Sequence, residues 1–578
     1  MSLSQLSKKV PPGLALIGSL LFNWKIASLP LTLLGIFRPN FWQAILIFLA
    51  TLPVSVAILV SLRDRRYAKR QKELGARLPP PIPSKSFAGL DVLKDLRREY
   101  HFGYIGELVS NWGEQLGHTM SATIFWEPRI FTTEPEYIKR ILATQFEYFE
   151  KGPVFRSYMT SLLGTGVFNA DGELWKFHRS MSRQFFTKEK ISHFDNFDRH
   201  ADKAISKLRD RLREGVPVDV QDLFCRFTLD SASEFLFGSD VQSLSADLPY
   251  PSTAKAAANH RVHPSDSFAN AFQKTQVASA ARSRVGRFWP LSEFWENKVE
   301  KEIQTVFDYV DPIVKRALET KKVKELSKVE SEHEDETLLE HMVRLTDDPI
   351  ILRDETLNIM VAGRDTTAAL ITFAVYMLSE HPHIYDRLRQ EIITTVGNTN
   401  RPTPEDLRNM KYLRAVLNET LRLFPSVPFN IRYSAVDVVW PSLTGGKPYF
   451  IPAGTRCLYS PYIMQRRKDL WGPTAEEFDP DRFIDDRKAL LASNPFMFLP
   501  FNAGPRICLG QQFAYNEASF MVVRLVQSFK SFRLAMEDHP ESLPPPEWKA
   551  SGTGRKVVEK VNVKGHLTIY AKVRYSLR

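Results

Sequence analysis

One cysteine of this chain stands in a setting suited to binding a soft metal ion. Cys508 follows Arg506 by two residues, in the run 501–510. Cysteine ligates iron as a thiolate, which persists where a metal, a nearby cation or a helix start offsets its charge. Arg506 is such a cation, and apolar residues at helical spacing over 511–526 predict a helix that begins just after the sulfur. The run therefore predicts a shielded thiolate ligand.

Two glycines of the same run have separate expected uses. Gly504 permits a turn with positive φ, and Gly510 lets a flat macrocycle approach the backbone where a β-carbon would collide. Cys508 by itself would by default be an inert core cysteine beside a turn. The complete pattern F-x-x-G-x-R-x-C-x-G favours the ligand.

A second motif lies within a long predicted helix, 349–380, which has no internal proline. Gly363 is followed there by Asp365, Thr366 and Thr367. Glycine costs about 1 kcal/mol in a helix interior, and threonine can bond back to the preceding turn. The motif therefore predicts a functional distortion such as a widened turn. Read alone, the same residues are more often structural.

Two further pairs lie on single helix faces. Glu419 and Arg422 are three residues apart and can form a charge-assisted pair. Trp175 and Arg179 are four apart on a helix expected to start near Glu173, where the alternative is a surface stack of the two side chains.

These motifs resemble those of the cytochrome P450 monooxygenases, and the run 502–517 is most similar to the fungal branch that hydroxylates alkanes and fatty acids. The resemblance implies a mainly α fold with small β-sheets. It also implies haem b, with Cys508 as the ligand of its iron and with Asp365 and Thr366 as a proton relay. The chain has no dinucleotide or flavin fingerprint. Electrons must therefore come from another protein, and the resemblance implies NADPH-cytochrome P450 reductase, with cytochrome b5 as a further partner.

The resemblance also assigns supporting residues. Those expected against the haem are Trp175, Arg179, Arg432, Phe501, Arg506 and Gly510. Arg482 is expected to complete a structural triad with Glu419 and Arg422, and the expected substrate contacts are Val427, Pro428 and Phe429. Gln465 stands where many members have histidine, and His178 is expected to face solvent.

Composition limits the remaining classes. The chain has 578 residues, a formal net charge of +11 and three cysteines. So few cysteines cannot form a disulfide framework, which indicates a reducing compartment. The basic residues are spread along the chain with one dense cluster, and neither an RNA-binding aromatic motif nor a zinc-type array is present. We therefore expect a membrane surface or an acidic protein as partner, and no nucleic acid.

The N-terminal part predicts a membrane anchor. The run 41–62 carries no charge and is long enough to span a bilayer as a transmembrane helix, and a basic cluster follows it. Residues 63–83 form a basic, proline-rich linker, with the run 79–83 as a stiff spacer, and 84–578 form the catalytic domain. In the leader 1–40, the stretch 13–37 is either a second span or an interfacial segment. The expected location is the endoplasmic reticulum membrane, with the catalytic domain facing the cytoplasm.

The sequence thus predicts a haem-thiolate monooxygenase that inserts one oxygen atom of O2 into an apolar substrate. Long-chain alkanes or fatty acids are favoured, but polycyclic aromatics and terpenoids need the same apolar cavity. The alternatives outside this class are an enzyme that rearranges hydroperoxides and a haem sensor or carrier. The pair Asp365 and Thr366 argues against rearrangement, which needs no proton relay.

Overall fold

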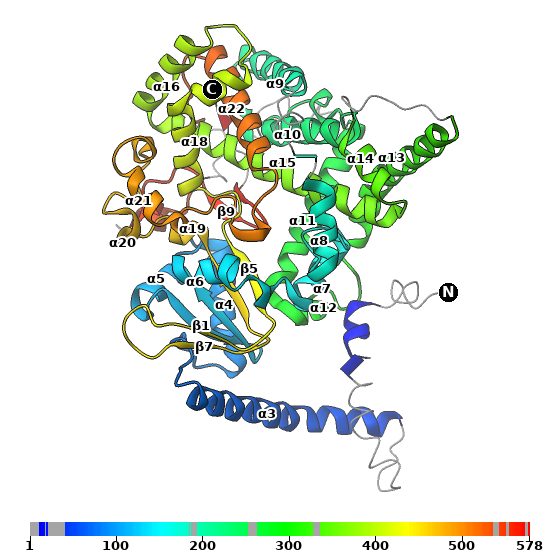
Figure 1. Ribbon diagram of the computed structural model, residues 1–578, viewed down its shortest axis with the longest axis vertical. Helices are drawn as coiled ribbons and strands as arrows, with labels where there is room; N and C mark the ends of the chain where they lie inside the picture. The colour runs from blue at the N-terminus through cyan, green and yellow to red at the C-terminus, as the bar shows by residue number, and fades with distance from the viewer. Residues whose placement is uncertain are drawn as a thin grey trace.

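The computed structural model describes residues 11–17, 19–20, 41–183, 185–186, 194–251, 263–327, 336–535, 543–550, 554–572 and 576–577. Helices make up most of this part of the chain, and a small sheet region lies between the main helical body and α3 (Figure 1). The predicted mainly helical fold with small sheets is confirmed.

The helices follow one another along the chain as Figure 1 labels them. Their bounds are α3 Phe41–Glu73, α4 Leu90–Phe102, α5 Glu107–Leu116, α6 Pro135–Lys139, α7 Gly152–Leu163, α8 Gly172–Arg183, α9 Asp195–Arg213, α10 Val220–Phe237, α11 Pro264–Val285, α12 Trp289–Ser292, α13 Glu300–Ser327, α14 Leu338–Leu345, α15 Pro349–Glu380, α16 Pro382–Thr395, α17 Pro404–Asn409, α18 Lys411–Leu423, α19 Pro461–Met464, α20 Lys468–Trp471, α21 Lys488–Ser493, α22 Gln511–Ser528 and α23 Pro546–Ala550.

The largest sheet has the order β1-β2-β8-β5-β3, in which β2 and β8 are parallel and the other neighbours antiparallel. Its strands are β1 Thr119–Ile124, β2 Glu127–Thr132, β3 Phe149–Glu150, β5 Asn430–Ser434 and β8 Arg456–Tyr459. Three two-stranded sheets are formed by β4 Val218–Asp219 with β11 Ser576–Leu577, β6 Val438–Trp440 with β7 Tyr449–Ile451, and β9 Val563–Gly565 with β10 Ile569–Ala571.

Helix α15 crosses the helical body with the bounds that the sequence predicts. Nearly all of its side chains from Thr367 to Leu378 are buried, because α10, α18 and α22 pack around it. A helix that is apolar on all sides belongs in such a core. The widened turn predicted at Gly363 is wrong, since α-helix continues through it. The Thr366 hydroxyl donates to the Ala362 carbonyl, which satisfies the back-bonding tendency without opening a turn.

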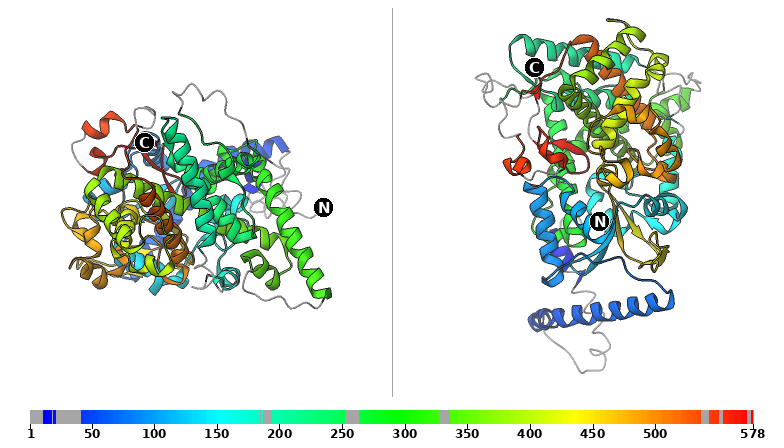
Figure 2. Two further views of the ribbon diagram at one scale, coloured as in Figure 1. Left: turned by 90° about the horizontal axis from the view of Figure 1, so that it is seen from above. Right: turned by 90° about the vertical axis from the view of Figure 1, so that its left-hand side faces the viewer.

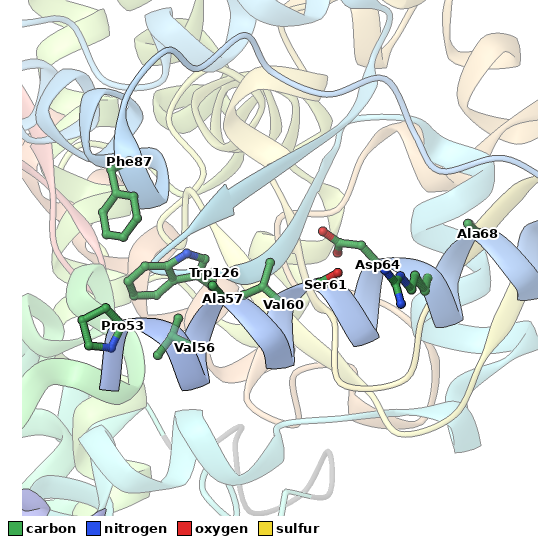
Figure 3. A pocket seen from close by; sticks show the side chains of 10 residues that line it. Pro53, Val56, Ala57, Val60, Ser61, Asp64, Ala68, Phe87 and Trp126 are labelled. Atoms are coloured by element: carbon green, nitrogen blue, oxygen red, sulfur yellow. The ribbon is translucent and has the colours of Figure 1, made fainter. Parts of the chain in front are cut away.

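Helix α3 lies alongside the sheet region and crosses the molecule below it (Figures 1 and 2). Its side chains meet Trp126 in the β1–β2 turn and Phe87, as Figure 3 shows. Among the described residues, no helix combines the length and the apolar character needed to cross a bilayer, so the predicted span over 41–62 is not confirmed. Most of the stretch 13–37 lies outside the described residues.

The proline run is extended, as expected, but it is bonded to the sheet. The Ile82 amide donates to the Ser121 carbonyl at 2.7 Å, and the Ser121 amide donates to the Pro80 carbonyl at 2.8 Å. Ile82 is buried. The run therefore extends the edge of the sheet at β1 and does not form a free spacer.

Candidate active site

A cavity of about 940 Å³ lies between α15 and the loop that precedes α22. Phe501, Cys508 and Gly510 line it from the loop, and Thr366 lines it from α15. Val427 and Phe429, between α18 and β5, form part of another wall. Residues from distant parts of the chain thus meet at one space.

The loop around Cys508 has the backbone that its glycines predict. Gly504 has φ of 71°, and a β-carbon there would lie 1.8 Å from the Leu142 carbonyl oxygen, so only glycine fits. The Cys508 amide donates to the Phe501 carbonyl at 3.0 Å, which closes the loop. Helix α22 begins at Gln511, just after the sulfur, as predicted.

The Cys508 thiol opens into the cavity but is otherwise enclosed by protein. Burial raises its pKa, while a hydrogen bond from the Gly510 backbone and the charge of Arg179 lower it. Arg179, and not the expected Arg506, is therefore the cation that acts on the sulfur. Burial raises the pKa of Cys225 to about 12, and Cys457 is fully buried in β8, so both suit inert core thiols.

Arg506 takes part in a cationic wall of the cavity. Its guanidinium lies 4.6 Å above the Trp175 ring centroid and 2.9 Å from Asp171. Burial and the charge of Arg432 lower the pKa of Arg506 to about 10. In the described part of the chain, the Nε atoms of Arg432 and Arg506 have no hydrogen-bond acceptor. This wall therefore has donors ready for anionic groups.

Lys151 is a third cation of this wall and was not found from the sequence. It lines the cavity, and burial together with Arg432 and Arg506 lowers its pKa well below the ordinary value. No local motif marks it, because it comes close to the two arginines only in the folded chain. A thiolate ligand, a glycine beside it at position 510 and cations with free donors at one edge together fit haem, which carries two carboxylates.

The two residues of the expected proton relay are placed differently. Thr366 lines the cavity, and its carbonyl accepts a hydrogen bond from the Ser426 hydroxyl at 2.8 Å. Asp365 does not line the cavity, and its carboxylate lies 3.6 Å from Arg364. Successive residues of an α-helix point about 100° apart, and in this turn of α15 Thr366 and Thr367 line the cavity while Asp365 does not.

Glu517 in α22 is a buried carboxyl that forms no ion pair with any cation in the described part of the chain. Burial raises its pKa to about 8, and the nearby hydroxyls of Ser231 and Thr367 act in the opposite direction. No described atom completes a hydrogen bond with either of its carboxylate oxygens. Glu517 therefore holds a proton at neutral pH beside the helix that carries Thr366. The sequence signal was its place at the end of the run 502–517.

The expected triad is assembled. Arg422 donates to both oxygens of Glu419, at 2.7 and 2.8 Å, and Arg482 Nε lies 3.4 Å from Glu419 Oε1. Gln465 is fully buried, donates to the Leu421 and Arg422 carbonyls, and accepts from the Leu499 amide at 2.8 Å. The triad and Gln465 thus connect α18 to the segment that leads into the Cys508 loop.

Two other residues lie elsewhere than expected. Pro428 does not line the cavity, and its carbonyl accepts from the Ser460 hydroxyl at 2.9 Å. His178 is fully buried and lies 3.0 Å from Glu355 of α15. Its helix contacts α14, and His178 itself reaches Glu355 of α15, so this side of α8 is covered by protein.

The comparisons with known proteins agree with this site. A family model described as Cytochrome P450 matches residues 96–554, which include all site residues described above. Cytochrome P450 52E1 of Candida apicola is 35% identical over 82% of this chain and 89% of its own length. Cytochrome P450 52A3-B of Candida maltosa is 34% identical over 83% and 90%. Cytochrome P450 monooxygenase pvhE of Talaromyces variabilis is 34% identical over 85% and 90%.

Proposed function

This chain belongs to the cytochrome P450 family, and we propose that it hydroxylates long-chain alkanes or fatty acids at or near the chain end. It is a monooxygenase with haem as its cofactor and a thiolate as the ligand of the iron. The observation that carries the proposal is the cavity, which joins the open Cys508 thiol, Thr366 and apolar walls. Apolar walls favour the transfer of an apolar substrate from water into the cavity.

The bound haem supplies the activation of O2 for insertion into a C–H bond. In our proposal Cys508 would ligate its iron, and Phe501 and Gly510 would contact the macrocycle. The free donors of Arg432 and Arg506 would hold the haem carboxylates, and Arg179, Trp175 and Lys151 line the same cavity. Each carboxylate would be costly to bury without such cations.

Thr366 is proposed to deliver protons to the reacting oxygen, since its hydroxyl is at the cavity wall. Asp365 is proposed to supply protons from outside the cavity, a role that requires water or a side-chain rearrangement between the two residues. Val427 and Phe429 are proposed to guide the substrate. Terminal C–H bonds are stronger than internal ones, so oxidation there needs walls that let only the chain end reach the haem.

We propose NADPH-cytochrome P450 reductase as the electron donor, with cytochrome b5 as an additional donor, and the endoplasmic reticulum membrane as the location. In this proposal 84–578 are the catalytic domain, on the cytoplasmic side. Exposed apolar side chains on α3 support contact with a bilayer, among them Trp42, Leu46, Leu49, Val54 and Leu59. The basic cluster over 63–72 suits anionic lipid.

The proposal is tested with the full-length holoenzyme and a reductase. Dodecane or dodecanoic acid should drive NADPH-dependent oxygen uptake and give mainly terminal alcohol. Cys508→Ala should lose the thiolate-type spectrum of the reduced carbon monoxide complex, whereas Cys225→Ala should keep it. Ready oxidation of polycyclic aromatics with none of linear chains would overturn the aliphatic assignment. An unchanged spectrum in Cys508→Ala would overturn the ligand assignment.

A further inference from the structure

Two buried arginines lie directly opposite each other in the largest sheet. Arg129 in β2 is the register partner of Arg456 in β8. Their exposed fractions are only 4% and 5%. Like charges that face each other across two strands are destabilising, and burial removes the water that would screen them. The pair therefore calls for negative charge nearby.

One carboxylate, that of Glu127, lies near both arginines. Glu127 Oε2 lies 3.8 Å from Arg129 Nη2 and 3.7 Å from Arg456 Nη1, while Glu127 Oε1 is held by Arg287 at 2.6 Å. The two longer distances exceed a hydrogen bond. Among the described residues, no acceptor binds Nε or Nη2 of Arg129 or Nη1 of Arg456. Three guanidinium groups thus share one carboxylate, and the buried two keep free donors.

The pair is separate from the cationic wall assigned to the haem. The pKa of Arg129 is lowered to about 9 by burial and by Arg456, with Glu127 and Tyr158 acting against them. The groups that act on the pKa of Arg506 are different, namely Arg432, Asp171, Glu150 and Arg179. We therefore assign the haem carboxylates to Arg432 and Arg506 and treat the Arg129 pair as a separate group.

The free donors are at the cavity that also holds Cys508. Arg129, Arg456 and Tyr158 all line it, and the Tyr158 hydroxyl is a hydrogen-bond partner of Arg456. Gly286, with φ of 68°, lies against the pair. A β-carbon at Gly286 would be 2.6 Å from Arg456 Nη1 and 3.3 Å from Arg129 Nη2. Glycine there leaves the donors uncovered.

We propose that Arg129 and Arg456, with the Tyr158 hydroxyl, bind the carboxylate of a long-chain fatty acid substrate. Two carboxylate oxygens match the planar donors of paired guanidinium groups better than any neutral group does. The inference rests on the proposed function, because it takes the aliphatic substrate class as given and selects acids over alkanes within it. With the acid end held at the arginines, the far end of the chain is the part that reaches the haem.

The test is the haem spectral shift of the full-length holoenzyme, titrated with dodecanoic acid, methyl dodecanoate and dodecane. Arg456→Gln and Arg129→Gln should each raise the Kd of the acid about tenfold or more, the usual loss for a charge-assisted hydrogen bond. Both should leave the Kd of the ester unchanged. Tyr158→Phe should give a smaller rise. The matched control is Arg284→Gln, since Arg284 also lines the cavity but stacks on Tyr100.

The outcomes separate this inference from the function on which it rests. The carboxylate site is overturned if both arginine variants bind the acid as the wild type does, or lose acid and ester equally. It is also overturned if the wild type binds dodecane and the ester but not the acid. Binding of none of the three compounds overturns the aliphatic function itself. The reduced carbon monoxide spectrum checks folding, and a variant that fails this check is replaced by Tyr158→Phe.

Discussion

Two groups of buried arginines, each around one glutamate, differ in how their charges are satisfied. Around Glu419, Arg422 donates to both carboxylate oxygens and Arg482 lies 3.4 Å away. Around Glu127, Arg129 and Arg456 come no closer than 3.7 Å. These four arginines are all buried, so the contrast between them is one of hydrogen bonding and not of exposure to solvent.

The remaining donors of the two groups also point to different partners. Arg422 donates to the carbonyls of Gln465, Ala475 and Glu477, and Arg482 donates to Thr474. The free donors of Arg129 and Arg456 belong to side chains at the cavity. A buried charge group closed by the backbone stabilises a loop, whereas one left open at a cavity is available to a ligand.

The largest expected effect comes from breaking the closed group, which consists of Glu419, Arg422 and Arg482. Glu419→Gln removes the carboxylate between two buried arginines, so it should destabilise the holoenzyme by about 3–5 kcal/mol. The lost anchor should also release haem, because the triad holds the segment that leads to Cys508. Urea unfolding followed by haem absorbance measures both effects.

Glu405→Gln is the matched control, since Glu405 is exposed on α17. Its free energy of unfolding should stay within about 0.5 kcal/mol of the wild type. Equal, small losses in Glu419→Gln and Glu405→Gln would show that the closed group does not stabilise the loop.

Glu517 sharpens the comparison because it is a buried carboxyl that pairs with none of the described arginines. Its pKa is raised to about 8 from 4.5, so between these values the folded protein keeps a proton that the unfolded chain has lost. This contribution to stability therefore falls as the pH rises, by about 1.4 kcal/mol per pH unit. In Glu517→Gln the free energy of unfolding should not fall in this way. Between pH 5 and pH 7 the variant should therefore gain about 3 kcal/mol of stability relative to the wild type.

Urea unfolding at several pH values measures the difference between the two proteins. A difference that does not change with pH would mean that Glu517 is ionised in the folded state. Glu405→Gln serves again as the control, because Glu405 is an exposed carboxyl on α17.

The Glu419–Arg422 pair of the closed group and the Cys508 loop could be predicted from the sequence because the residues that form each of them are close together in the chain. Glu419 and Arg422 are three residues apart on one helix, and the loop contains its own glycines and cysteine. Helix α15 was predicted with its bounds because its apolar pattern has no internal proline. Such patterns need no knowledge of which distant segments meet.

The open group, which consists of Arg129 and Arg456 near Glu127, could not be predicted because it depends on strand pairing. Arg129 and Arg456 become neighbours only through the parallel register of β2 and β8, and nothing near either residue in the sequence marks it. The expected exposure of His178 is wrong, and Asp365 and Pro428 do not line the cavity, for a related reason. A family motif names the residues, but the direction of each side chain depends on the helix phase and on the elements that pack against it.

The next prediction concerns hydroxyls at and away from the cavity. Thr366→Ala should bind substrate normally but lower the product formed per NADPH about a hundredfold, with peroxide released instead, because a proton donor is lost. Thr372→Ala is the matched control on the same helix, since Thr372 is buried and does not line the cavity. Unchanged product per NADPH in Thr366→Ala would place the relay at another group, with Glu517 as the next candidate.

The smallest expected effect has the opposite sign in the two arginine groups. Arg456→Met removes one of two like charges that face each other, so it should leave the free energy of unfolding unchanged or raise it by up to about 1 kcal/mol. Arg422→Met, the matched change in the closed group, should lower it by several times that amount. Urea midpoints of the ligand-free holoenzymes measure both.

Equal losses in the two variants would mean that Arg456 is held by the fold as firmly as Arg422, and the distinction between a closed and an open group would fail. A gain in Arg456→Met together with weaker acid binding is the combination expected of a residue kept for its ligand at a cost in stability.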